Sequence, residues 1–398
     1  MQIKLKGVNM KKIMSCILSA AIILGISSCG SAEEETEPTV TTEAQIVEAR
    51  PLGEMRGISA KELIGEMNAG WNLGNTMDAI GGETAWGNPV TTKEMIDEVR
   101  KAGFDTIRIP TTWHKNMGEA PDYTVDEEWM NRVEEIVDYA LGNDMYVILN
   151  THHESSWLKP QYDGLEEVKE KLKALWNQIA LHFNDYGDHL IFEGLNEPRI
   201  EGGKNEWNGG TEEGRDCLNQ LNSLFIETVR ATGGNNEKRT LLITTFAAQP
   251  SQSGIKDLVI PEDEYVGISI HAYTPYRFTY DSKGESWNAT VFDESCENEI
   301  VSLFEQLNKH FISKDIPVII TEYGSVWKYQ GAVDLKMNTE EVEKWASCYV
   351  SEAGKYGIPC VWWDNGYYYS GNELFGIFNR RELSWYVPGL VDIITKKK

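Results

Sequence analysis

The feature that most limits the fold is a repeated alternation along the chain. Short apolar runs rich in β-branched and aromatic residues are followed by longer amphipathic stretches, and these are the patterns of buried strands and of surface helices. The apolar runs end near Asn75, Pro110, Asn150, Glu197, Thr245, Tyr273, Glu322 and Asn365. The clearest amphipathic stretches span residues 92–102, 127–142, 165–183, 215–231, 295–313 and 339–355. Strands that alternate with helices form parallel sheets, so we predict an α/β fold, a closed (β/α)8 TIM barrel in a single domain.

Local signals agree with this prediction. Ser59 with Glu62, and Thr91 with Glu94, fit the capping box that begins a helix. The connection between the fifth and sixth runs holds only a short helical piece, near residues 255–260. No G-x-G-x-x-G turn follows the first run, which weakens the alternative of an open, dinucleotide-binding sheet.

The first 50 residues differ from the rest. Several lysines precede an apolar run from Ile13 to Ile26, as in a secretory signal. The run is shorter than the ~20 apolar residues that span a bilayer, although a retained membrane anchor is the alternative. Its end, Ile26-Ser27-Ser28-Cys29, resembles a bacterial lipobox, which implies cleavage before Cys29 and lipid on that cysteine. We therefore predict a lipoprotein-type signal peptide at 1–28, an acidic flexible linker at 29–50 and one catalytic domain at 51–398.

Charge and cysteine content exclude some classes of protein. The chain has a net charge of −25, which makes it a poor partner for nucleic acid and is compatible with a neutral polymer. We expect a monomer that meets a membrane only through Cys29. Cys217, Cys296, Cys348 and Cys360 lack metal-ligand spacing. We expect buried thiols there, although an exported chain could pair some of them.

Polar residues of reactive types stand at nearly every predicted strand end. They are Asn72, Asn75, Arg108, His152, His153, Asn196, Glu197, His271, Tyr273, Glu322, Trp363 and Asp364. Any one of them could cap a loop or satisfy buried backbone. In a barrel, however, the carboxyl ends of all strands converge on one mouth, where the active site lies. So many together indicate a functional site.

Glu197 and Glu322 follow strongly apolar runs, the fourth and the seventh. Two carboxyl groups that flank a glycosidic bond suffice for its hydrolysis. Arg108 near one carboxylate would keep it ionised, and a tyrosine hydroxyl could add a hydrogen bond. Asn196 offers an amide that can bind a sugar 2-hydroxyl. The alternative is that Glu197 only ends a strand before Pro198, and that Glu322 only begins a turn.

Metal and esterase chemistry have weaker support. His152, His153 and Glu154 do not form H-E-x-x-H, and neighbouring residues at a strand end point to opposite faces, so we expect no shared ion. No G-x-S-x-G elbow is present, which argues against an esterase.

Among 13 tryptophans, Trp363 and then Trp207 are the best candidates for stacking on a sugar, while many others must be core.

Several motifs occur together and in order: GWNLGNTMDA (70–79), TAWGNP (84–89), IRIP (107–110), THHE (151–154), LNEPR (195–199), HAY (271–273), TEYG (321–324) and WWDNG (362–366). With these the chain resembles glycoside hydrolase family 5, and most of all its subfamily of bacterial endo-β-1,4-glucanases, mixed-linkage glucanases and xyloglucanases. The resemblance covers nearly all of the chain after residue 50.

The resemblance implies Glu197 as proton donor and Glu322 as nucleophile, with Arg108, His152, Asn196, His271, Tyr273 and Trp363 in support. Asn75 joins the candidate supporting residues from its place at a strand end, and we expect no cofactor or metal. His152 matches the family position better than His153. We expect an exported, retaining endo-β-1,4-glucanase that acts on cellulose-type or mixed-linkage glucan. Xyloglucanase and β-mannanase are its nearest rivals. A lipid-anchored glycan-binding protein without catalysis is the rival from another class, and the presence of both carboxylates disfavours it.

Overall fold

The computed structural model describes residues 52–280, 290–330, 336–371 and 373–396. The signal peptide, Cys29 and the whole of the linker lie outside these residues and stay predictions. Within them no helix combines the length and apolar character needed to cross a bilayer.

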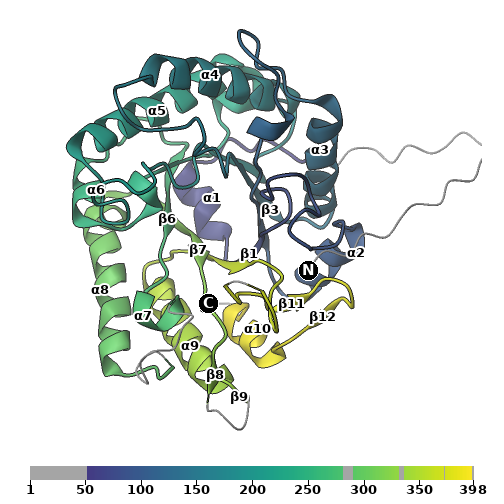
Figure 1. Cartoon of the computed structure of the whole chain (residues 1–398), viewed down its shortest axis with the longest axis vertical. Coiled ribbons are helices and arrows are strands. Elements are labelled where there is room, and N and C mark those ends of the chain that lie inside the picture. The colour runs from purple at the N-terminus through teal and green to yellow at the C-terminus, as the bar shows by residue number, and fades with distance from the viewer. Residues whose placement is uncertain (1–51, 281–289, 331–335, 372, 397–398) are drawn as a thin grey trace, which may run out of the picture. The chain divides into compact units, whose positions relative to one another are not determined.

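A closed barrel of parallel strands forms the centre of the domain (Figure 1). Its strands are β1 (Ala69–Leu73), β2 (Thr106–Ile109), β3 (Tyr146–Asn150), β4 (Leu190–Glu193), β5 (Leu241–Thr244), β6 (Val266–His271), β7 (Val318–Tyr323) and β10 (Cys360–Asp364). They are hydrogen-bonded in the order β1-β10-β7-β6-β5-β4-β3-β2. The predicted (β/α)8 barrel is confirmed.

Helices surround the barrel, and the first of them lies across one of its ends (Figure 1). They are α1 (Ala60–Glu66), α2 (Lys93–Lys101), α3 (Glu127–Leu141), α4 (Leu165–His182), α5 (Glu212–Ala231), α6 (Gln252–Asp257), α7 (Tyr276–Thr279), α8 (Glu294–His310), α9 (Thr339–Lys355) and α10 (Pro388–Ile394). Short two-stranded ribbons, β8 (Tyr329–Gln330) with β9 (Lys336–Met337) and β11 (Phe378–Asn379) with β12 (Ser384–Trp385), lie in the late connections. All the predicted helical stretches are present within a few residues.

The helix-start predictions had different outcomes. Ser59 and Glu62 form the expected capping box at α1. The box predicted for Thr91 is wrong, because α2 begins after Thr92, which makes no side-chain cap bond. The backbone N–H of Thr91 donates instead to Glu83 at 2.6 Å.

The interior of the barrel has an apolar layer, which helix α1 covers at the amino ends of the strands. Strand residues such as Ile148, Leu242 and Ile319 pack with Leu63 and Ile64 of α1, and all are buried. Helix α1 is seen through the centre of the barrel in Figure 1, where it covers the amino ends of the strands. The outward strand residues pack against the surrounding helices in a second, larger core.

Above the apolar layer, the next inward positions are polar. Because side chains alternate along a strand, the residues two further along form a ring that we call the polar layer. Its members are Asn72, Arg108, Asn150, Glu193, Thr244, Ser269 and Thr321, and all are fully buried. Buried polar groups are costly unless they are hydrogen-bonded. The members of this layer must therefore hydrogen-bond to one another or to the nearby backbone.

A β-bulge interrupts the alternation on β7. Ile270 pairs with Ile320, but the next residue, His271, pairs with Glu322. The extra residue on β7 lets Thr321 and Glu322 both face the barrel interior, because a bulge re-aims the side chains that follow it. The catalytic candidate on β7 therefore depends on this irregularity.

The described cysteines are all thiols: Cys217, Cys296 and Cys360 are buried and Cys348 is half-buried, as predicted apart from the partial exposure of Cys348.

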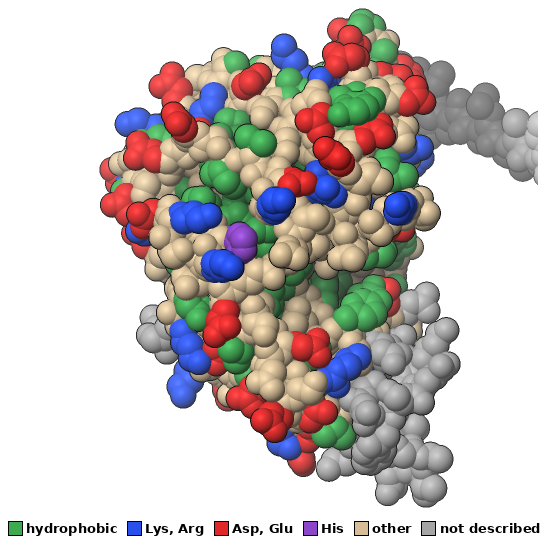
Figure 2. Space-filling view, turned by 90° about the vertical axis from the view of Figure 1, so that its left-hand side faces the viewer, with side chains coloured by type: hydrophobic (Ala, Val, Ile, Leu, Met, Phe, Trp, Pro, Cys, Tyr) green, Lys and Arg blue, Asp and Glu red, His purple; other side chains and the backbone are tan. Residues whose placement is uncertain are grey.

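On the flank that carries α6 and α8, acidic and basic side chains are interspersed (Figure 2).

Candidate active site

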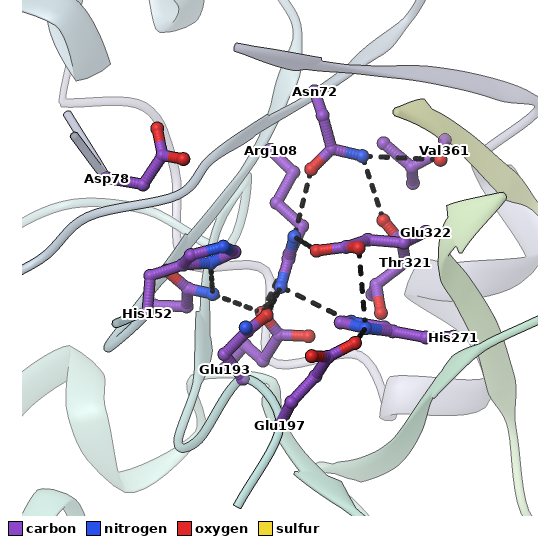
Figure 3. A network of polar contacts seen from close by, with 12 residues as sticks. Asn72, Asp78, Arg108, His152, Glu193, Glu197, His271, Thr321, Glu322 and Val361 are labelled. Carbon is purple, nitrogen blue, oxygen red and sulfur yellow. Dashed lines mark hydrogen bonds and ion pairs between the residues drawn. The ribbon is translucent and has the colours of Figure 1, made fainter. Parts of the chain in front are cut away.

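Arg108 is the centre of the polar network at the mouth of the barrel (Figure 3). Its Nε donates to Glu193 at 2.7 Å, and its Nη1 donates to Glu322 at 2.6 Å and to Asn72 at 3.0 Å. Its Nη2 donates to Asn196 Oδ1 at 2.7 Å. Burial would lower the pKa of the guanidinium, but the two carboxylates outweigh burial and raise it. Arg108 is thus a fixed cation between two carboxylates.

Glu322 is held on both carboxylate oxygens. Oε1 accepts from Arg108, and Oε2 accepts from the Tyr273 hydroxyl at 2.9 Å. Burial and the neighbouring carboxylate Glu322 raise the pKa of Tyr273 well above its ordinary value, so the tyrosine stays a donor. Glu322 is 5 % exposed. The two donors therefore fix the orientation of the Glu322 carboxylate.

Glu197 lies in the connection after β4, four residues beyond the end of the strand. Its Oε1 lies 2.9 Å from His271 Nδ1, and its Oε2 lies 3.4 Å from Arg199 Nη1. Burial would raise the pKa of this carboxyl, but the His271 hydrogen bond and nearby Arg199 outweigh burial, so the pKa lies below its ordinary value.

His271 lies between the two carboxylates. Its Nδ1 is 2.9 Å from Glu197 Oε1 and 3.4 Å from Glu322 Oε2. One carboxylate oxygen of Glu197, one of Glu322 and a ring nitrogen of His271 all lie within 4.8 Å of one another. Arg108 Nη2 approaches Nε2 at 3.5 Å. Because a guanidinium can only donate, Nε2 faces a donor and Nδ1 carries the proton shared with Glu197.

His152 and Trp363 form a flat pair at one side of the mouth. Their rings are parallel, with an interplanar angle of 1° and centroids 5.8 Å apart. Burial, assisted by His153 and Arg108, lowers the pKa of His152 well below its ordinary value. Asn150 Nδ2 approaches His152 Nδ1 at 3.2 Å, while Asn150 Oδ1 accepts from Thr111. His152 is therefore neutral, with its proton on Nε2.

The expectation that His152 and His153 point to opposite faces is wrong. β3 ends at Asn150, so strand alternation no longer applies, and the two rings lie 4.5 Å apart. With Asp78 they form a cluster whose ligand atoms lie within 4.8 Å. The hydrogen bonding does not fit a metal ion, because His152 Nδ1 accepts from Asn150 and Nε2 then carries a proton. His153 packs on Trp86 instead, with centroids 5.5 Å apart.

Two predicted supporting residues lie away from the carboxylates. Asn75 is in the turn after β1 with a left-handed backbone (φ 55°), and its N–H and C=O bond to Asp78 and Asn88. The side chain in the network is that of Asn72. Trp207 is half exposed, and its ring lies 4.4 Å from the guanidinium of Arg199.

Sequence reasoning missed the role of Glu193. Its carboxylate accepts from Arg108, from Asn150 at 2.9 Å and from Ser269. The signal was present as a lone charged residue in the apolar run LIFEGL. A charge inside a buried strand implies a buried partner, and that partner is Arg108.

Comparison with known proteins agrees with this geometry. Residues 72–369 match the family model described as Cellulase (glycosyl hydrolase family 5). The chain is 55 % identical to endoglucanase A of Ruminococcus albus, over 86 % of this chain and 93 % of that protein.

Two solved structures are also similar. A broad-specificity endoglucanase from Ruminococcus champanellensis with bound cellotriose has a TM-score of 0.82 and 41 % identity, over 86 % of this chain and 100 % of that one. A xyloglucan-specific endo-β-1,4-glucanase from a metagenomic library has a TM-score of 0.80 and 42 % identity, over 84 % and 98 %.

A parallel barrel with a facing pair of glutamates at its carboxyl mouth defines a glycoside hydrolase. The chain belongs to glycosyl hydrolase family 5, the cellulase family.

Proposed function

We propose that the chain is an endo-acting β-glycanase that hydrolyses β-1,4-glucosidic bonds in cellulose-type or mixed-linkage glucans with retention of configuration. The observation that supports this most directly is that oxygens of Glu197 and Glu322 lie within 4.8 Å of one another. Retaining enzymes place their carboxyl groups about 5–5.5 Å apart, and inverting enzymes about 6.5–9.5 Å apart, to leave room for water. The short separation favours direct attack by one carboxylate.

In the first step Glu322 attacks the anomeric carbon and forms the glycosyl ester, while the bond to the leaving oxygen breaks. Arg108 and Tyr273 orient the nucleophile. The leaving oxygen takes the carboxyl proton of Glu197 in its protonated form, while Oε1 of that group keeps the hydrogen bond from His271 Nδ1.

In the second step a water molecule attacks the same carbon. Ionised Glu197 accepts one proton of that water, and the ester bond to Glu322 breaks. The two inversions restore the original configuration, and Glu197 and Glu322 return to their starting states. Asn196 would support both steps, because Arg108 binds its Oδ1 and so assigns its Nδ2 as the donor that a sugar 2-hydroxyl could accept from.

Trp363, only 9 % exposed and backed by His152, offers a flat apolar face for the sugar that is attacked. The names of the relatives favour a glucan backbone, and the xyloglucan-specific relative keeps xyloglucan as the second candidate. Initial rates of reducing-sugar release from carboxymethylcellulose, lichenan, xyloglucan and glucomannan would decide. Faster release from glucomannan than from every glucan would overturn the choice of backbone.

The two glutamates should fail in different ways. Glu322→Ala should abolish glycosylation even of an activated aryl glycoside, and azide in the vacated space should give the inverted α-glycosyl azide. Glu197→Ala should keep the first step with a good leaving group and stall in the second, where azide needs no base and gives the β-azide. On natural glucan, loss of acid–base help should cost about 10²–10⁴ in rate. The opposite azide products would reverse the roles, and wild-type rates on glucan would remove that residue from the mechanism.

We also propose that the enzyme is exported and held at a membrane through lipid on Cys29, supported by the basic start, the short apolar run and the acidic stretch that follows. Without that lipid it would be a secreted enzyme.

A further inference from the structure

Arg199 contacts the proposed acid/base from the side opposite His271. Its Nη1 donates to the carbonyl oxygen of Glu197 at 3.1 Å and to Oε2 of the same residue at 3.4 Å. His271 meets Oε1. Each oxygen of the Glu197 carboxylate therefore has a different cationic or proton-bearing neighbour.

Arg199 is itself held firmly. Its Nε donates to Glu206 Oε1 at 3.0 Å, and Glu206 Oε2 accepts from the backbone of Gly202 at 2.8 Å. The ring of Trp207 lies against the guanidinium at 4.4 Å, a cation–π contact. The side chains of Arg199 and Glu206 are 19 % and 18 % exposed. An arginine that served only for solubility would not need three partners from one connection.

We infer that Arg199 is a positioning residue for Glu197, held in place by Glu206 and Trp207, and that it strengthens the acid by favouring the carboxylate formed as the proton leaves. This inference rests on the proposed function, because it assumes that Glu197 transfers a proton. Negative charge develops on Glu197 only as the leaving oxygen is protonated. The attraction of Arg199 is then greater in the transition state than in the ground state, and only such a difference raises the rate.

A purely structural role is the alternative, in which Arg199 only ties down the connection between β4 and α5. Arg215 provides a matched control for that role. It anchors the far end of the same connection, donating from Nη1 to the carbonyl of Gly209 at 2.8 Å and from Nε to Asp257 at 2.8 Å. Its partners do not include Glu197, so Arg215→Gln should disturb the connection and leave the proton transfer unchanged.

The test compares Arg199→Gln, Arg199→Lys and Arg215→Gln on aryl β-cellobiosides that span good and poor leaving groups. Loss of the cation favours the protonated carboxyl, so Arg199→Gln should move the alkaline limb of kcat/KM to higher pH by about 0.5–1 unit. This is the lower end of the shift that one nearby charge produces, because the site is partly solvated. Rates should fall about tenfold or more with a poor leaving group and little with a good one. Arg199→Lys keeps the charge. Its alkaline limb should therefore lie at the wild-type pH, and its rate with a poor leaving group should lie between those of Arg199→Gln and the wild type.

Trp207→Ala tests how Arg199 is held. It should shift the alkaline limb in the same direction as Arg199→Gln, by a smaller amount, because the guanidinium loses one of its supports. An increase in KM alone, with no shift, would mean that Trp207 acts only on the sugar and would overturn its part of the inference. If Arg199→Gln does not fold, Arg199→Lys and Trp207→Ala still decide.

An unshifted limb in Arg199→Gln, or equal rate losses for all leaving groups as in Arg215→Gln, would overturn the inference about Arg199. Neither result bears on whether Glu197 is the acid/base, which Glu197→Ala decides separately.

Discussion

Replacement of Glu193 by glutamine removes one negative charge from beneath the two catalytic candidates with little change in shape. The amide oxygen can still accept from Arg108 and Asn150, which both donate to the same carboxylate oxygen. The Ser269 hydroxyl can turn to accept from the new amide nitrogen, because Thr321 Oγ1 lies 2.6 Å away to receive its proton. The substitution therefore tests charge rather than packing.

The magnitude follows from these contacts. Hydrogen bonds to charged groups contribute about 1.5–3 kcal/mol and neutral ones about 0.5–1.5 kcal/mol, so each converted bond loses roughly 1 kcal/mol. Relief of the desolvation of Glu193 offsets part of this. We expect the free energy of unfolding to fall by about 1–2 kcal/mol, and Tm by about 2–6 °C.

The effect on rate has a separate cause. In the wild type, the guanidinium of Arg108 contacts the carboxylates of both Glu193 and Glu322. In Glu193→Gln it acts on Glu322 alone and stabilises the nucleophile before attack. About 1.4 kcal/mol of such stabilisation slows attack tenfold, so we expect kcat on an aryl β-cellobioside to fall about tenfold.

Asp188→Asn is the matched control. Asp188 is also buried and pairs with an arginine, Arg56, at 2.7 Å, but before the amino end of β4. Calorimetry should show a similar loss of Tm in Asp188→Asn, and its kcat should equal that of the wild type. If Glu193→Gln keeps wild-type kcat, or loses no more than the control, the charge of Glu193 does not act on the nucleophile.

Other predictions concern metal, anchoring and pH. EDTA should leave the initial rate on glucan unchanged, because His152 Nδ1 accepts from Asn150 and its Nε2 carries the ring proton; a loss restored by a divalent ion would contradict this. Cys29→Ala should release active enzyme from the membrane fraction, and a variant that still sediments with membranes would refute the anchor. Burial, opposed by the backbone N–H groups of Thr76 and Asn75, raises the pKa of Asp78 to about 6. A raised carboxyl pKa contributes stability that is complete below its unfolded value near 3.8 and is lost as pH rises through about 6, an effect of roughly 2–3 kcal/mol. Asp78→Asn should therefore flatten the fall in Tm between pH 4 and pH 7, and an unchanged slope would show that Asp78 is not the cause.

The strand ends and the glutamate pair could be predicted because they depend on patterns within short segments. Apolar runs mark buried strands, and parallel strands must bring their carboxyl ends together. Glu197 and Glu322 could be paired in this way without knowledge of any contact. Arg108 and Tyr273 also lie where the strand ends indicated.

The rest could not be predicted because it depends on local departures from regular structure. Counted from Ile319, simple alternation would turn Glu322 away from the barrel, and only the bulge on β7 returns it. His152 and His153 lie side by side because β3 has already ended. Glu193 is a lone charge at the end of β4, but nothing in its own segment shows that its buried partner is Arg108.

The polar layer has a consequence for how such an enzyme can change. Its members bond mainly to one another and to strand backbone, as when Asn72 donates to the carbonyl oxygen of Thr321 and Thr244 to that of Ser269. The machinery that orients Arg108 is thus built into the wall of the barrel. Loops that touch the polymer could be exchanged between related enzymes without retuning the nucleophile. Substitutions within the layer would instead slow hydrolysis of every polymer alike, so new polymer preferences should arise by loop grafting.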